Sequence, residues 1–146
     1  MGWTWRAGLA RCCLCKGGHL VLRHHAFGQV SAWQPVEIRQ PGRLVDSLEA
    51  DVRNEGNRQP VIVELYNLDA GPVLTYIDGL QKNTPRYQIA RNNCSHIVAN
   101  ALMAGAKRGP SFIPNAGHYG HMARILGLGI WTPDQVLRFA KELKFV

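Results

Sequence analysis

The sequence contains no long apolar segment, no dense basic tract and few acidic residues. No stretch approaches the roughly 18 apolar residues that a membrane-spanning helix needs, so stable membrane insertion is not expected. Basic and aromatic residues do not alternate, which disfavours a nucleic-acid partner. The 17 Lys and Arg residues against 10 Asp and Glu give a net charge of +7. This balance favours anionic partners such as cell-wall polymers, acidic membrane surfaces or an acidic inhibitor protein.

Cysteine is scarce, and its spacing does not suit a metal site. The four cysteines are Cys12, Cys13, Cys15 and Cys94. Adjacent thiols bind one metal poorly, and the second distant pair that a structural zinc site requires is absent, even though His19 follows the cluster. A disulfide between such close neighbours would be strained. We therefore expect no metal and no cofactor.

Length and composition indicate one globular domain over residues 1–146. Of these residues 46% are hydrophobic and 18% are charged, and no linker, repeat or low-complexity tract divides the chain. Residues 1–17 fit no single element, since Trp3 and Trp5 alternate as on a strand but Gly and Arg interrupt them. Arg11 and Lys16 break the apolar run of this segment, so it makes a poor signal peptide.

Strand patterns occur at 18–24, 27–33, 61–65 and 87–90. The first two are expected to form a hairpin, with Ala26 in the turn and with His24 and His25 as turn residues. The third run is apolar and β-branched, which predicts a central strand.

Helical patterns occur weakly over 44–52, after a loop marked by Pro35, Pro41 and Gly42, and strongly in two later regions. Asp69 is predicted to cap one helix, and Thr132 with Pro133 the last one. Their packing faces are predicted to be Val73, Leu74, Ile77 and Leu80 in the first and Val136, Leu137, Ala140 and Leu143 in the second. The Gly- and Pro-rich residues 105–129 predict a long surface connection with a short helix at 121–126.

One further stretch, 87–105, organises the rest of the chain. Asn92 and Asn93 end its short strand, and from Cys94 the apolar residues fall at the helical positions 94, 97, 98, 101 and 102. Asn93 suits an N-cap because its side-chain oxygen can accept from an early helix N–H, and Gly105 is a natural C-terminal stop. Cys94 is therefore predicted in the first turn of a helix, on its inward face.

This position suits a reactive thiol. The thiolate is the nucleophilic form, and the free N–H groups and positive dipole end of a helix start lower a cysteine pKa from its usual value of about 8.5. His96 lies about 200° around the helix from Cys94, so a base must come from elsewhere in the chain. The alternative for Cys94 is a small buried apolar residue at the head of a core helix.

The block Asn93-Cys94-Ser95-His96-Ile97-Val98 resembles the Asn-Cys-Glu-His-Phe-Val block of the circularly permuted NlpC-type branch of papain-like enzymes. In that branch the catalytic histidine precedes the cysteine, on a strand near the start of the domain, and Gly18-His19-Leu20-Val21-Leu22 is similar to that context. Ser31-Ala32-Trp33-Gln34-Pro35 and Trp131-Thr132-Pro133 resemble parts of one subgroup, the cell-wall-targeting effectors of bacterial type VI secretion. The resemblance covers most of the chain from Gly18 onward.

The resemblance implies a role for each matching residue. Cys94 would be the nucleophile and His19 the general base. The residue that orients the histidine falls at Ser31, which is neither the histidine nor the carboxylate of related enzymes, so a backbone carbonyl or a dyad stays open. The candidate substrate-binding residues are Asn93, Trp33 and His118.

The same resemblance implies an α+β, papain-like fold in which a small antiparallel sheet packs against the helix of Cys94. It implies a cysteine hydrolase that cleaves an amide bond in peptidoglycan stem peptides. Such an antibacterial effector would leave the producing bacterium by a non-classical route and act in the target periplasm, and an acidic immunity protein would protect the producer. Two alternatives stay open: a lipid acyl hydrolase or acyltransferase of the same fold, and a non-catalytic binding module with a cysteine-rich N-terminus.

Overall fold

The computed structural model describes residues 3–8, 11–16, 19–22, 24–26, 42–44, 53, 61–86, 88, 91–119 and 126–145. Up to residue 44 it describes the backbone path and strand pairing, and from residue 61 it also describes side chains. Strands and helices both occur, as the α+β prediction requires.

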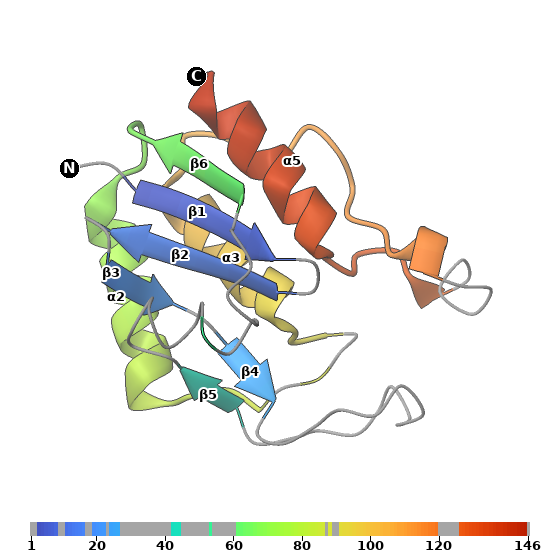
Figure 1. The fold of residues 1–146 in the computed structure, drawn as a ribbon, viewed down its shortest axis with the longest axis horizontal. Coiled ribbons are helices and arrows are strands. Elements are labelled where there is room, and N and C mark those ends of the chain that lie inside the picture. The colour runs from blue at the N-terminus through green and yellow to red at the C-terminus, as the bar shows by residue number, and fades with distance from the viewer. Residues whose placement is uncertain are drawn as a thin grey trace.

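A four-stranded antiparallel sheet forms the centre of the fold (Figure 1). Its strands are β1 (Trp3–Gly8), β2 (Arg11–Lys16), β3 (His19–Leu22) and β6 (Val61–Leu65), in the spatial order β3-β2-β1-β6. A separate two-stranded sheet pairs β4 (His24–Ala26) with β5 (Gly42–Leu44). Strand formation within residues 1–17 agrees with the alternation of Trp3 and Trp5.

Several strand predictions need correction. The run at 61–65 is a strand as predicted, but it lies at the sheet edge beside β1 and not in the centre. His24, His25 and Ala26 are strand residues rather than turn residues, because β5 supplies them with a pairing partner. Gly42 and Leu44 therefore belong to a strand, and not to a loop and a helix. The predicted partner strand at 27–33 lies outside the described residues.

The helix α2 (Ala70–Lys82) confirms the predicted cap at Asp69, whose side chain accepts from the backbone N–H of Gly71 at 3.0 Å. The buried residues of α2 are Val73, Ile77 and Leu80. Leu74 was predicted in the same stripe but is 38% exposed, because three residues already fill the face that meets α3.

The helix α5 (Pro133–Lys144) begins with Pro133 at its first position, as predicted. Its buried face is Val136, Phe139, Ala140 and Leu143. Leu137 was predicted on this face but is half-buried, and Phe139 takes the inner position instead. Thr132 is the N-cap residue by position, but its side chain makes no capping hydrogen bond, which corrects the predicted cap.

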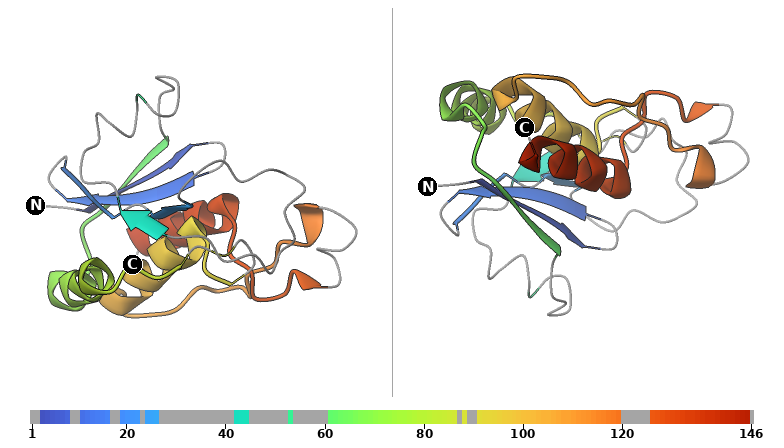
Figure 2. Two further views of the ribbon diagram at one scale, coloured as in Figure 1. Left: turned by 90° about the horizontal axis from the view of Figure 1, so that it is seen from below. Right: turned by 90° about the horizontal axis from the view of Figure 1, so that it is seen from above.

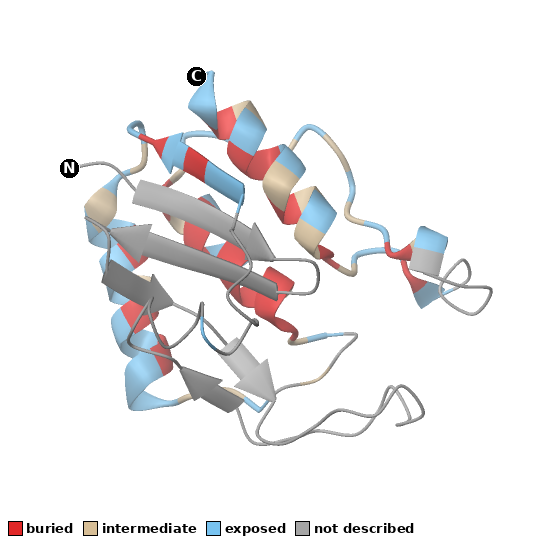
Figure 3. Ribbon diagram, viewed as in Figure 1, coloured by how far each residue is buried: buried red, intermediate tan, exposed pale blue. Residues whose placement is uncertain are grey.

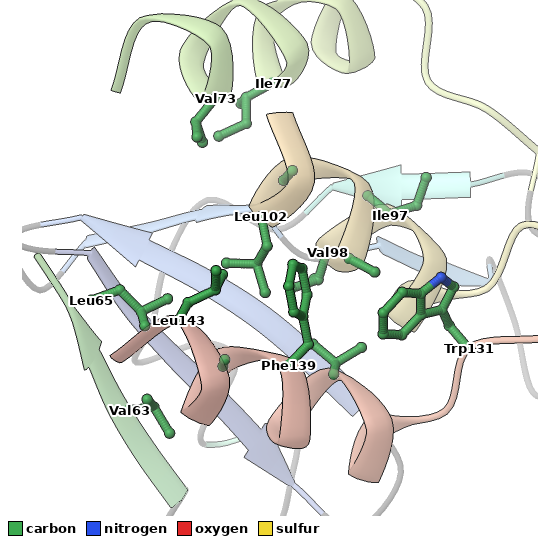
Figure 4. Packing of buried hydrophobic residues seen from close by; sticks show 14 of the residues in the cluster. Val63, Leu65, Val73, Ile77, Ile97, Val98, Leu102, Trp131, Phe139 and Leu143 are labelled. Carbon is green, nitrogen blue, oxygen red and sulfur yellow. The ribbon is translucent and has the colours of Figure 1, made fainter. Parts of the chain in front are cut away.

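Helix α3 (Cys94–Gly105) occupies the middle of the molecule. Helices α3 and α5 cover one face of the four-stranded sheet, and α2 packs on α3 (Figure 2). Buried residues line the sides of α3 and α5 that meet each other and the sheet (Figure 3). Figure 4 shows Phe139 between Leu102 and Trp131 in the resulting core. This packing holds α3 rigidly from several sides.

The last turn of α3 approaches α2 very closely. A Cβ atom added at Gly105 would lie 2.4 Å from the Val73 side chain and 2.7 Å from the backbone oxygen of Asp69. The Asp69 N–H donates to the Gly105 carbonyl at 2.8 Å. Glycine is therefore needed here for helix contact.

Within the part of the chain that the structure describes, no helix has the length and apolar character to cross a membrane.

Candidate functional site

The first turn of α3 is fixed by one asparagine. The Asn93 side-chain oxygen accepts from the His96 N–H at 2.9 Å, which confirms the predicted N-cap. The amide nitrogen of Asn93 donates to the Trp131 carbonyl at 3.1 Å in a buried contact. Asn93 thus joins the start of α3 to the residue before the α5 cap, and its own exposure is 8%.

Cys94 follows directly and occupies the first helical position. It is 6% exposed, on the same buried face as Ile97 and Val98, as the apolar spacing predicted. The first turn of α3 carries no acidic residue. A thiolate here would lie at the positive dipole end of α3 without a competing carboxylate in the first turn of that helix.

The starts of α3 and α5 together contain buried polar atoms that have no hydrogen-bond partner. Among the described residues these atoms are His96 Nδ1, Thr132 Oγ1 and Gln135 Oε1. Burying a polar atom without a partner costs free energy, and such exceptions gather at functional or hydrated sites more than in plain cores. Because Thr132 is only 4% exposed, its hydroxyl lies well inside the molecule.

His96 is half-buried on α3 and is held apart from Cys94 by helix geometry. Burial lowers its pKa below the usual 6.5, and a hydrogen bond with the backbone of Gly129 opposes this shift. His96 therefore stays neutral at physiological pH and connects α3 to the segment before α5. This position supports a packing role near the site.

The structure does not bring the start of β3 to the start of α3. In the strand register Lys16 pairs with both Trp3 and His19, and Trp3 pairs with Leu65. His19 therefore lies in one row with Leu65. Leu65 borders a small pocket with Ala106, which follows the last turn of α3. The start of β3 is thus near the last turn of α3, whereas Cys94 begins that helix at its other end.

Two other histidine segments lie closer to the start of α3. Strand β4 contains His24 and His25, contacts α3, and lies beside its first turns in Figure 1. His118 is exposed in the 3-10 helix η1 (Gly117–Tyr119). The segment of His118 is tied to α5, because the Gln135 side chain donates to the Asn115 carbonyl. His118 is therefore near the same end of the molecule as Cys94.

The strand register divides the three N-terminal cysteines between the two faces of the sheet. The rows across β6, β1 and β2 are Val61–Ala7–Cys12, Ile62–Arg6–Cys13 and Glu64–Thr4–Cys15. Directly opposed residues share a face, and Val63 and Leu65 are buried while Ile62 is exposed. Alternation therefore places Cys12 on the helix-covered face and Cys13 on the opposite one. Sequence reasoning missed this difference.

The remaining predicted site residues, Ser31 and Trp33, lie outside the described residues. Among the described residues no group of three or more His, Cys, Asp or Glu side chains could hold a metal ion. The contributions of Thr132 and Gln135 were not foreseen. A Thr-Pro-x-Gln start of a helix was visible in the sequence, but its burial beside α3 was not.

Comparisons with known proteins found no match: no family model, no curated protein and no solved structure resembles this chain significantly.

Proposed function

We propose that this protein is a cysteine hydrolase in which the Cys94 thiolate attacks an amide carbonyl. The observation that carries this proposal is the position of Cys94 in the first turn of a rigidly packed helix, beside the Asn93 cap and free of a first-turn carboxylate. Helix starts of this kind stabilise a thiolate and can also donate backbone N–H groups to an oxyanion. The papain-like form of the α+β fold belongs to this proposal.

The reaction has two halves. A histidine removes the thiol proton, the sulfur forms a bond to the carbonyl carbon, and the negative charge moves to the carbonyl oxygen near the helix start. When the C–N bond breaks, the histidine returns its proton to the departing amine and a thioester remains. Water then adds to the thioester with the same histidine as base, which releases the carboxylic acid and restores the thiol.

The proposed substrate is the stem peptide of peptidoglycan. Two features support this choice: the net charge of +7, which favours an anionic cell wall, and the resemblance of 93–98 to the cysteine block of wall hydrolases. The protein would act as an antibacterial effector in the target periplasm after non-classical secretion. A basic effector of this kind would be held in check by an acidic immunity protein in the producer.

The test compares two compartments and one purified substrate. Expression in the bacterial cytoplasm should be tolerated, and fusion to an export signal should cause swelling or lysis that Cys94→Ala abolishes. Purified protein should release soluble muropeptides and new amine groups from isolated sacculi. If sacculi stay intact while cytoplasmic expression is toxic or alters membranes, the peptidoglycan substrate is wrong and a lipid acyl substrate takes its place. If Cys94→Ala is as active as the natural protein in every assay, the hydrolase proposal itself fails.

A further inference from the structure

Resting on the proposed function, we infer that the base for Cys94 comes from β4, as His24 or His25, and not from His19. The inference rests on the placement of β4 beside the first turns of α3 (Figure 1). It deepens the proposed site by identifying the strand that completes it.

Elimination among the described histidines points to the same strand, whereas His121 lies outside the described residues. His96 is on α3 itself, about 200° around from Cys94. The His19 backbone lies in the Leu65 row, at the Gly105 end of α3. A 12-residue helix is about 18 Å long, which exceeds any hydrogen-bond reach of a histidine side chain. His118 is near the same end of the molecule but is exposed on a segment fastened to α5, whereas Cys94 is buried.

Strand β4 is held in place on its other side. His24 pairs with Leu44 and His25 pairs with Arg43 in a regular antiparallel register, so both histidines have fixed backbone positions. Successive strand residues lie on opposite faces. His24 and His25 are therefore on opposite faces of β4. Because of this alternation, we expect only one of the two histidines to affect the reactivity of the Cys94 thiol.

The sequence alone favours His19 over this pair. A Gly-His pair before an apolar run resembles the expected family context, and local pattern predicts a turn at His24 and His25. Once 24–26 forms a strand paired with 42–44, the two histidines become strand residues with a defined alternation. Non-local pairing, which the sequence does not display, thus changes which histidine is the candidate.

The experiment measures the reactivity of the Cys94 thiol directly, without any substrate. Iodoacetamide labelling of the intact protein is followed across pH 5 to 10, and peptide mass spectrometry reads the rate at Cys94 separately from the other cysteines. The variants are His24→Gln, His25→Gln and His19→Gln. Circular dichroism and thermal melting confirm that each variant is folded before its labelling rate is interpreted.

We expect one of the two β4 variants to lower the Cys94 labelling rate at pH 6.5 at least tenfold and to move its inflection toward about 8.5, the value of a free thiol. The other β4 variant and His19→Gln should label like the natural protein. Loss of reactivity in His19→Gln with both β4 variants normal would overturn the inference, and so would three normal variants.

Hydrolysis of sacculi by the same variants separates the two proposals. If one β4 histidine activates the thiol but no sacculus is cleaved, the base is identified and the peptidoglycan substrate is wrong. If sacculi are cleaved by a Cys94-dependent reaction that neither β4 variant affects, the hydrolase stands and the β4 assignment fails.

Discussion

The two ends of α3 are built for different purposes. Its first turn contains buried polar groups. Asn93 caps it, Cys94 is its first helical residue, and the buried His96 Nδ1 has no hydrogen-bond partner in the described structure. Its last turn is closely packed, since Gly105 leaves no room for a Cβ beside Val73. Ile97, Val98 and Leu102 lie between the two ends and are buried almost completely.

This contrast teaches that a polar, capped start and a closely packed end can occupy opposite ends of one helix. A tight contact at Gly105 fixes the axis of α3 against α2, and the hydrogen bond from Asn93 to Trp131 fixes its start against α5. Cys94 lies next to the Asn93 anchor and at the opposite end of the helix from Gly105. Changes at the two ends should therefore separate loss of stability from loss of activity.

The largest effect is expected for Cys94→Ala. Removing the proposed nucleophile should reduce amide hydrolysis by at least about a thousandfold, because the remaining groups cannot form the thioester. The melting temperature should change little, since alanine fits a buried helical position. Muropeptide release and thermal melting measure the two quantities. Cys13→Ala is the matched control, because Cys13 lies on the opposite face of the sheet and should leave hydrolysis unchanged.

Gly105→Ala tests the other end. Its new Cβ would overlap Val73 and the Asp69 backbone, so we expect the free energy of unfolding to fall by about 1–3 kcal/mol, as in other overpacked sites. Chemical denaturation measures this change, and activity per folded molecule should stay near normal. Gly79→Ala is the control in α2, where nothing lies within 4 Å of the added atom. The Gly79→Ala variant should be stabilised by about 0.5–1 kcal/mol. Equal destabilisation of Gly79→Ala and Gly105→Ala would refute the packing explanation.

Asn93 permits a finer division, because its side chain makes two bonds. Asn93→Ala should cost about 1 kcal/mol or more, since the cap is lost and the buried Trp131 carbonyl loses its donor. Asn93→Ser retains a capping oxygen but not the amide donor. It should therefore recover part of the stability in denaturant titration while hydrolysis stays reduced. Full recovery of both by serine would show that the Trp131 bond is unimportant.

The smallest effect concerns pH. Burial holds the pKa of His96 below 6.5 in the folded state, so the unfolded chain takes up this proton first as pH falls. The stability contributed by neutral His96 is complete above about pH 6.5 and declines below it. His96→Gln should therefore flatten the fall in melting temperature between pH 7 and pH 5. An unchanged slope in His96→Gln would contradict this explanation.

Local patterns in the sequence predicted the helices well. The cap at Asn93, the inward face of Cys94 and the start of α5 at Pro133 all follow from residues within one or two turns. Helix caps and apolar spacing are short-range properties, so one sequence is enough to read them. The prediction of Leu137 instead of Phe139 on the α5 face shows the limit, since Leu137 lies only at the margin of the arc formed by Val136, Phe139, Ala140 and Leu143.

The sheet was harder to predict because its pairing is non-local. The composition of 61–65 indicated a strand, but its edge position depends on β1, whose residues are remote in sequence. The strand 24–26 depends in the same way on 42–44. The same difficulty applies to the candidate site. Cys94 could be identified from its own helix, whereas the position of any histidine relative to it depends on strand register.

The pairing of β1 on both sides has a consequence for how the chain reaches its fold. β1 can form a hairpin with β2 as soon as both are synthesised, because they follow each other directly. Its other edge must wait for β6, since Trp5 pairs with Val63, roughly sixty residues later, and closing so long a loop carries a larger entropic cost.

During that interval the backbone N–H and C=O groups along one side of β1 are unpaired, the condition in which strand edges associate with other chains. Completion of the sheet, rather than formation of α2, α3 or α5, should therefore limit the folding rate, because non-local contacts form most slowly. A nascent chain of this protein is most vulnerable to aggregation between the synthesis of β2 and the arrival of β6.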